Sequence, residues 1–409
     1  MLTVGQVLAL TRISRINKKN LTYAITNFRA GTPSFDELLV FAQTIKANCT
    51  AGELTPLLKA AEEQVAFATV NEIQVISVLD PLYPKKLNGI PNQPLVLFVK
   101  GNALILNTQL SVAVVGTREA TALSLDFTKK FAVSIAKSGI CVVSGLAIGC
   151  DTAAHEGAID STGCTIAVMA HGLDMIYPKE NIALAEKIIA AGGCIVSEHT
   201  LGVKPQKRFF VQRNRIQSGL SAATFVVQSA KSGGTMTTAN HCLSQGRTLV
   251  CMDVAKEFID SKDYEGNMLL IKNGAQTVSD PVNIKPFIDM LEPMASENVS
   301  TADASLINSD SDKARPFQWT ALRPKAFTAP RRILQPLTPG LNAISATLGT
   351  SEDGNSAEEP KSKSLNTLEK TPVNGQHVFF SLNKGKRPRQ KEESDVNHAS
   401  AKIPKWLVM

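Results

Sequence analysis

The sequence predicts an α/β protein built on a Rossmann-like, doubly wound and mostly parallel sheet, preceded by a small helical domain and followed by a disordered tail. Between residues 111 and 252, short apolar runs alternate with longer runs whose apolar side chains recur every three or four positions. Apolar strands that alternate with helices are typical of a parallel sheet covered on both faces. After about residue 295 this periodicity is lost, and polar and charged residues predominate, which is typical of a disordered segment.

Length and composition indicate a soluble protein of more than one domain. The chain has 409 residues, too many for a single compact core, and 44% of them are hydrophobic. Neither an apolar stretch of 18 residues nor a basic leader ahead of an apolar segment is present, so we expect a cytoplasmic protein without membrane contact. The net charge of +7 mildly favours acidic partners such as nucleic acid without deciding for them.

Residues 1–70 are expected to form the helical domain. Apolar side chains recur at helical spacing in four runs, at 4–10, 21–28, 35–45 and 54–67. Ser34 precedes the third run and Glu37 follows three positions later, which predicts a capping box at the start of that helix.

Residues 71–295 are expected to form the Rossmann-like domain, which opens with two strands around a proline-rich stretch. Strands are expected at 73–79, 95–99, 112–115, 140–143, 165–169, 194–197, 224–227 and 248–252. Helices are expected at 124–137, 152–159, 182–191, 213–221 and 237–245. Because ligands bind at the carboxyl ends of the strands in such a sheet, the loops there form the candidate site.

Residues 296–409 are expected to form a low-complexity, largely disordered basic tail. Two basic islands lie in it, at 315–332 and 384–389, and its last residues, 403–409, are mostly apolar. A scaffold that works mainly through this tail, by recruiting a partner or adding DNA affinity, is therefore one function to consider.

Two glycine-containing loops follow the first two strands of the alternating part. Gly116 and Thr117 precede Arg118; glycine lets backbone amides approach an anion, and arginine offers a fork of donors suited to phosphate. The first loop is equally compatible with an ordinary strand-to-helix turn. Ser144 and Gly145 end the next strand, where a phosphate or a ribose would sit.

A basic, aromatic segment and a second glycine loop complete the candidate site. Residues 204–215 include Lys207, Phe210, Arg213 and Arg215, and cations beside an aromatic ring suit the phosphates and bases of single-stranded nucleic acid. A solvated basic loop with its phenylalanines turned into the core is the alternative. The second glycine loop consists of small residues before the helix expected at 237–245, namely Ser232, Gly233, Gly234 and Thr235. Such a loop forms either an anion-binding nest or a plain turn.

The sequence contains no convincing set of reacting groups. A Walker A loop, a G-x-S-x-G elbow, an H-E-x-x-H helix and a Cys/His cluster with metal spacing are missing, so we expect no catalytic residue, metal or cofactor. Glu198 is the best candidate for a reacting carboxylate, and His155 is expected to be structural. The seven cysteines form no C-x-x-C pair, which predicts reduced core thiols.

Together these motifs resemble the DNA-processing protein A family (DprA, also called Smf). The resemblance covers residues 70–285, and the helical N-terminus resembles the SAM-like domain that precedes the Rossmann fold in many members. Val211 stands where the family usually has proline, and a winged-helix-like pattern is missing after residue 295. The matching motifs include Tyr83-Pro84, Gly116-Thr117-Arg118, Ser144-Gly145-Leu146-Ala147, Gly172-Leu173-Asp174, Ser197-Glu198, Arg213-Asn214-Arg215, Ser218-Gly219-Leu220-Ser221 and Ser232-Gly233-Gly234.

The resemblance implies a cytoplasmic, non-enzymatic recombination mediator. Such a protein forms a homodimer, protects incoming single-stranded DNA and helps to load a RecA-type recombinase during natural transformation in competent cells. By position, Arg118 and Lys207 would contact phosphate and Phe210 would stack on a base. The residues that would shape the pocket are Gly116, Ser144, Gly145, Ser232 and Gly233. A nucleotide-derivative sensor, or a phosphoribohydrolase-like enzyme on the same fold, is the alternative.

Overall fold

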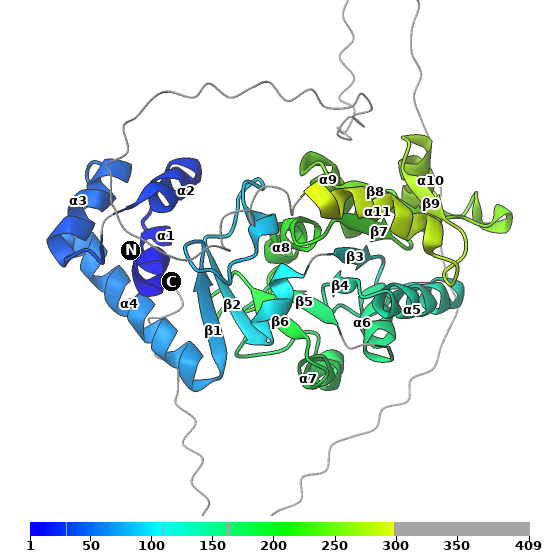
Figure 1. Cartoon of the computed structure of the whole chain (residues 1–409), viewed down its shortest axis with the longest axis horizontal. Helices are drawn as coiled ribbons and strands as arrows, with labels where there is room; N and C mark the ends of the chain where they lie inside the picture. Colours follow the sequence, from blue (N-terminus) through cyan, green and yellow to red (C-terminus); the bar gives the residue numbers. More distant parts are fainter. Residues whose placement is uncertain (30, 109, 162–163, 298–409) are drawn as a thin grey trace, which may run out of the picture. The chain divides into compact units, whose positions relative to one another are not determined.

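The structure, a computed structural model, describes residues 1–29, 31–108, 110–161 and 164–297. Within these ranges nine strands form one sheet in the order β1-β2-β6-β5-β4-β3-β7-β8-β9 (Figure 1). Neighbouring strands from β6 to β9 in this order are parallel, whereas β2 pairs antiparallel with both β1 and β6. The predicted Rossmann-like, mostly parallel sheet is confirmed.

The central strands are short and buried at every position, as expected for a sheet covered on both faces. Val142 packs in the same core cluster as Phe131, whereas its neighbour Val143 packs with Ile216, because successive residues of a strand face opposite sides. The strands are β1 Ile73–Ser77, β2 Val96–Gly101, β3 Ser111–Val115, β4 Cys141–Ser144, β5 Thr165–Met169, β6 Cys194–Ser197, β7 Ala223–Val226, β8 Thr248–Met252 and β9 Gln276–Val278.

Helices cover both faces of this sheet. On one face lie α5 Ala122–Lys137, α6 Cys150–Ile159 and α7 Ile182–Ala190, and the opposite face carries α8 Lys207–Gly219 and α9 Gly234–Ser244. Two further helices close the domain at the β8 side, α10 Glu265–Lys272 and α11 Lys285–Glu297 (Figure 1). The sheet is therefore doubly wound.

Four helices precede the sheet, and each begins at a polar residue whose side chain accepts a hydrogen bond from a first-turn amide. They are α1 Val4–Thr11, α2 Lys18–Asn27, α3 Phe35–Ile45 and α4 Ala51–Val70. The capping box predicted from Ser34 and Glu37 is present: Glu37 Oε2 accepts a hydrogen bond from the Ser34 amide at 2.8 Å, and Ser34 Oγ accepts one from the Glu37 amide.

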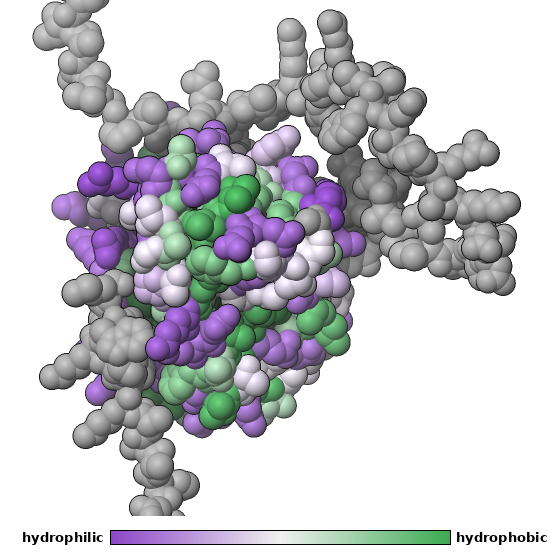
Figure 2. Space-filling model, turned by 90° about the vertical axis from the view of Figure 1, so that its left-hand side faces the viewer, coloured by the Kyte–Doolittle hydropathy of each residue, from purple (hydrophilic) through white to green (hydrophobic). Residues whose placement is uncertain are grey.

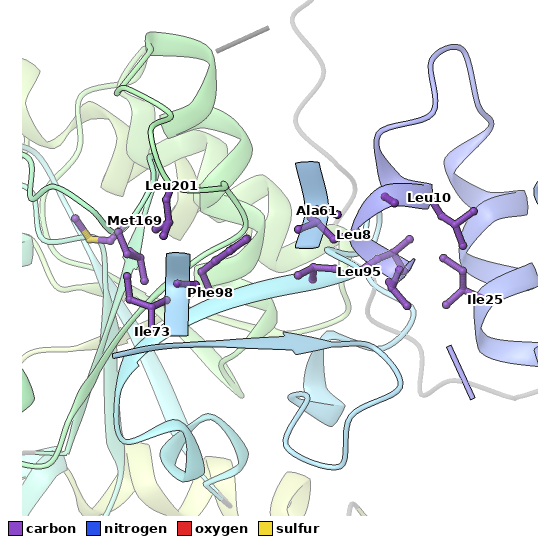
Figure 3. Close-up of a cluster of buried hydrophobic side chains, with 14 of the residues drawn as sticks. Leu8, Leu10, Ile25, Ala61, Ile73, Leu95, Phe98, Met169 and Leu201 are labelled. Carbon is purple, nitrogen blue, oxygen red and sulfur yellow. The ribbon is translucent and has the colours of Figure 1, made fainter. Parts of the chain in front are cut away.

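One apolar cluster joins these helices to the sheet. It runs from Leu10 and Ile25 in the helices to Phe98 of β2 and Leu201, which follows β6 (Figure 3). The Gln64 side chain adds two hydrogen bonds to the backbone of Leu201. Seen from the side of the N-terminal helices, hydrophobic residues also reach the surface between hydrophilic ones (Figure 2).

Several elements differ from the sequence-based expectation. Helix α8 begins at Lys207 rather than at residue 213, so the segment expected as a basic loop is its first half. Helix α9 begins at Gly234, so the end of the second glycine loop is helical. Strand β9 and helix α11 were not predicted. Of the predicted tail, 296–409, only the first two residues are described, and they end α11. Within the described residues, no helix is long and apolar enough to cross a membrane.

Candidate nucleic-acid interface

The order of the strands reverses between β3 and β7. Strands β4, β5 and β6 extend from β3 toward one edge, and the chain then returns through α8 to place β7 on the other side of β3. Ligands bind at such a switch point because the loops that leave its strands diverge and open a crevice. Here the two loops are joined by a hydrogen bond of 2.9 Å from the Thr117 amide to the Gln228 carbonyl oxygen.

A cavity of about 320 Å³ lies beside the switch point, at the carboxyl ends of β3, β4 and β5. Loops from all three strands contribute to it, and the start of α8 forms the fourth wall. Its lining residues are Arg118, Gly145, Ala147, Ile148, Tyr177, Pro178, Lys179, Glu180 and Phe210. The cavity therefore brings together three sequence-predicted residues, Arg118, Gly145 and Phe210, although the first and the last are 92 positions apart in the sequence.

Phe210 contacts an arginine and a tyrosine at this cavity. The Arg118 guanidinium carbon is 5.2 Å from the centroid of the Phe210 ring, a distance typical of a cation–π contact. The centroid of the Tyr177 ring lies 5.8 Å from that of Phe210, with the planes inclined by 50°. Arg118 and Tyr177 are both exposed, so the cluster offers a positive charge and aromatic surface to a ligand.

The loop after β4 is held in place by buried polar groups. Ala147 donates its amide to the Asp151 carboxylate, and Asn181 Nδ2 donates to the Leu146 carbonyl oxygen at 2.9 Å. Burial raises the pKa of the Asp151 carboxyl, an effect opposed by the nearby Arg213 cation. Ser144 is fully buried and its hydroxyl donates to the Val114 carbonyl oxygen, so it joins β3 to β4 and does not face the cavity.

Arg213 and Arg215 do not lie where the sequence suggested. Arg213 is 5% exposed and donates to the carbonyl oxygens of Gly145 and Val168. Arg215 is 6% exposed and donates to both carboxylate oxygens of Glu198, at 2.7 and 2.5 Å. Both residues lie in the second half of α8, which faces the sheet. Their guanidinium groups therefore make internal contacts, and these contacts do not support the expectation that the two arginines bind DNA.

Burial also changes the chemistry of this inner layer. It lowers the pKa of Arg213 to about 10, which leaves the side chain a cation at neutral pH beneath the loop of Gly145. Burial lowers the pKa of His155 to about 3, and its Nδ1 pairs with Thr165 Oγ1 at 2.8 Å. His155 is thus a neutral, internal residue. Glu198, the candidate reacting carboxylate, is already engaged by Arg215.

Lys207, Gly116 and Thr117 are not among the residues that line the cavity. Lys207 is exposed at the first position of α8, a helix whose first turn contains no acidic residue. Gly116 allows close packing of its loop against α6, since a Cβ at this position would overlap Cys150 Sγ at the start of that helix. Thr117 Oγ1 accepts a hydrogen bond from the Glu119 amide and so shapes the turn that presents Arg118.

The second glycine loop lies at the start of α9 and does not line the cavity. Ser232 and Gly234 are exposed, Gly233 is the N-cap, and Thr235 is buried. The loop is connected to α8 by a hydrogen bond of 3.4 Å from Asn214 Nδ2 to the Gly234 carbonyl oxygen.

Sequence reasoning missed several lining residues. Tyr177, Lys179 and Glu180 follow β5 and were not named as site residues. A signal was available: a tyrosine and a lysine in the loop after a buried strand lie at the ligand-binding edge of the sheet. Ile148, exposed in the loop after β4, had no such signal.

The fold and the cavity define a Rossmann-like binding protein with a cationic, aromatic site beside its switch point. The profile of the family described as DNA recombination-mediator protein A matches residues 74–289. The chain belongs to this family of DNA-processing proteins.

Similar proteins extend this result. The chain is 35% identical over 235 residues to DNA processing protein DprA of Bacillus subtilis (strain 168), covering 57% of this chain and 77% of that protein. It is 38% identical over 208 residues to protein Smf of Synechocystis sp., covering 50% of this chain and 51% of that protein. The X-ray structure of DNA processing protein A from Streptococcus pneumoniae superposes with a TM-score of 0.55 at 27% identity, covering 69% and 96% of the two chains.

Proposed function

We propose that this chain binds single-stranded DNA at the switch-point cavity and acts as a non-enzymatic mediator of recombination. The observation that carries the proposal is the contact of the Phe210 ring with both Arg118 and Tyr177 at the cavity. An aromatic ring beside exposed cations can stack on a base while the adjoining phosphates are neutralised. Base stacking needs bases free of a partner strand, which favours single strands over duplexes.

The charges around the cavity support a polyanionic ligand. Its lining residues include two exposed cations, Arg118 and Lys179, against one exposed acidic residue, Glu180, and Lys207 is exposed one helical turn before Phe210. Lys207 also stands at a helix N-terminus, where the helix dipole disfavours a cation by about 0.3–1 kcal/mol. A bound phosphate would relieve this repulsion, because the free amides of the helix start and the lysine both attract an anion.

Binding is tested by fluorescence anisotropy with labelled single- and double-stranded oligonucleotides. We expect Phe210→Ala to weaken single-strand binding about tenfold, since stacking on an aromatic ring contributes about 1–3 kcal/mol per base. Arg118→Glu and Lys207→Glu should weaken it as well and flatten its salt dependence. Lys137→Glu is the matched control, because Lys137 is exposed at the end of α5, away from the cavity. Affinity unchanged in the three site variants would disprove the proposal.

A small-nucleotide role is the competing function, because the cavity volume suits a single small ligand. The two roles are separated by calorimetric titration with mononucleotides beside an oligonucleotide. Tight binding of a mononucleotide, at an affinity equal to that of the oligonucleotide, would favour a sensor or a phosphoribohydrolase-like enzyme.

We further infer the cellular role that family membership suggests: a cytoplasmic homodimer that protects incoming DNA and helps to load a RecA-type recombinase during natural transformation. The test is assembly of the recombinase from the same organism on single strands coated with single-strand-binding protein, with and without this chain. Light scattering gives the oligomeric state, and a nuclease assay measures protection. Assembly that is equally slow with the wild type and with Phe210→Ala would contradict a mediator role.

A further inference from the structure

Next to Phe210, the first turn of α8 carries a second aromatic ring in a similar setting. The Arg208 guanidinium carbon lies 4.8 Å from the centroid of the Phe209 ring. The centroid of the His199 ring lies 4.3 Å from that of Phe209, with the planes inclined by 44°. Arg208 is exposed and Phe209 is half-buried. This cluster therefore repeats the arginine, phenylalanine and aromatic ring of the cavity.

The two rings face different sides of the same helix end. Successive side chains of an α-helix point about 100° apart, and here Phe210 meets Tyr177 of the cavity while Phe209 meets His199 of the loop after β6. A strand that crosses the start of α8 would thus pass from one ring to the other. The two clusters share no side chain, although their phenylalanines are adjacent in the sequence.

The N-terminal helices bring a further cation to the second cluster. Arg12, the C-cap residue of α1, is exposed and donates from Nη2 to Thr200 Oγ1 at 2.6 Å, next to His199. The loop that carries Thr200 is fixed from the same side, because Gln64 of α4 bonds both backbone groups of Leu201 and the Leu201 side chain is buried (Figure 3). Arg12 is therefore held beside this loop by packing and hydrogen bonds.

The charge around this loop is positive. Arg12, Lys204 and Arg208 are exposed there. Two acidic side chains adjoin the loop and both have protein partners: Glu198 is bound by Arg215, and Asp174 Oδ1 accepts the Gly202 amide at 2.8 Å. A polyanion can therefore approach the exposed cations.

We propose that Phe209 and Arg208 form a second nucleotide subsite on the same single strand, and that Arg12 of the N-terminal helices contacts its phosphate. This inference rests on the proposed function. It extends the DNA path from the cavity across the start of α8 to the N-terminal helices, and it gives those helices a part in DNA binding.

The test is an oligothymidylate length series in the full chain, measured by fluorescence anisotropy. We expect Phe210→Ala to weaken binding at every length, whereas Phe209→Ala should match the wild type on the shortest oligonucleotide that binds and lose about tenfold on longer ones. Phe209→Leu keeps apolar packing against His199 but lacks a ring, so it should show the same length-dependent loss with an unchanged thermal melting curve.

Arg12 has its own readout. Arg12→Ala should make the slope of log affinity against log salt shallower by about 0.7 on long oligonucleotides, the value for one phosphate of a single strand. Lys19→Ala removes the same charge from an exposed position of α2 and should leave the slope unchanged.

Wild-type affinity of Phe209→Leu on long oligonucleotides would overturn the subsite, and so would an equal loss at every length. Equal slopes for Arg12→Ala and the wild type would remove Arg12 from the DNA path. Failure of the proposed function is distinguishable, because in that case the wild type itself would not bind oligonucleotides and Phe210→Ala would change nothing.

Discussion

Arg213 donates a hydrogen bond of 2.9 Å from Nη1 to the carbonyl oxygen of Gly145, and this contact joins α8 to the floor of the cavity. A Cβ on Gly145 would collide with the same guanidinium group. The glycine is therefore required by a buried arginine, whereas the sequence assigned Gly145 to the shape of the pocket and Arg213 to DNA contact.

Gly145→Ala should lower the free energy of unfolding by about 1–3 kcal/mol, since overpacking in a dense region forces the neighbours to move. The measurement is urea denaturation followed by circular dichroism. Gly234→Ala is the matched control, because nothing lies within 4 Å of a Cβ at that position. Equal stability of the two variants would show that Arg213 can move aside at little cost.

Arg215→Met should destabilise the protein by about 3 kcal/mol, because it leaves the largely buried Glu198 carboxylate without its partner. Single-strand affinity of the folded variant should stay near that of the wild type, in contrast to Arg118→Glu. Combining Arg215→Met with Glu198→Gln should cost less than the sum of the single changes. A large loss of DNA affinity in stable Arg215→Met protein would restore Arg215 as a DNA contact.

Stability should fall as the pH is lowered below about 6.5, in part because of His155. Burial lowers the pKa of His155 from 6.5 to about 3 in the folded protein, so below pH 6.5 the unfolded chain takes up a proton that the folded chain does not. One such group lowers the free energy of unfolding by about 1.4 kcal/mol for each pH unit below 6.5, until the pKa of the folded state is reached.

His155→Gln isolates this contribution, because His171, His199 and His241 also have pKa values lowered by burial and act in the same direction. Urea denaturation at pH 7.5, 6.5, 5.5 and 4.5 should show that the free energy of unfolding falls less steeply with decreasing pH in the variant than in the wild type. Parallel curves for the variant and the wild type would mean that His155 is protonated in the folded state.

Cys164 should be the first thiol to react with Ellman's reagent in the native protein. All seven cysteines are free, and six are buried whereas Cys164 is half-buried. A hydrogen bond with Cys141 also lowers the pKa of the Cys164 thiol, which favours the reactive thiolate. We expect one rapid equivalent before unfolding and seven after it, and Cys164→Ser should remove the rapid one. Several rapid equivalents would indicate a core more open than the structure describes.

The sheet and its ligand-binding edge were predictable from the sequence, because periodicity is a local property. Short apolar runs such as 165–169, alternating with helical periodicity, indicate buried strands, and a glycine and an arginine after the first of these strands indicate an anion-binding loop. Phe210 and Arg118 were found in this way. Short elements with weak periodicity, such as β9, were not.

The direction of each charged side chain was decided only by the tertiary structure. Lys207, Arg208, Arg213 and Arg215 lie within one basic run of the sequence, yet the first two are exposed and the last two are buried. The reason is that the run forms one helix whose second half packs on the sheet. There Arg213 donates hydrogen bonds to the carbonyl oxygens of Gly145 and Val168, and Arg215 donates to the Glu198 carboxylate. Partners so distant in the chain leave no local pattern. The sequence by itself therefore predicted the fold and an anionic ligand, and the folded chain decided which of the cations are exposed.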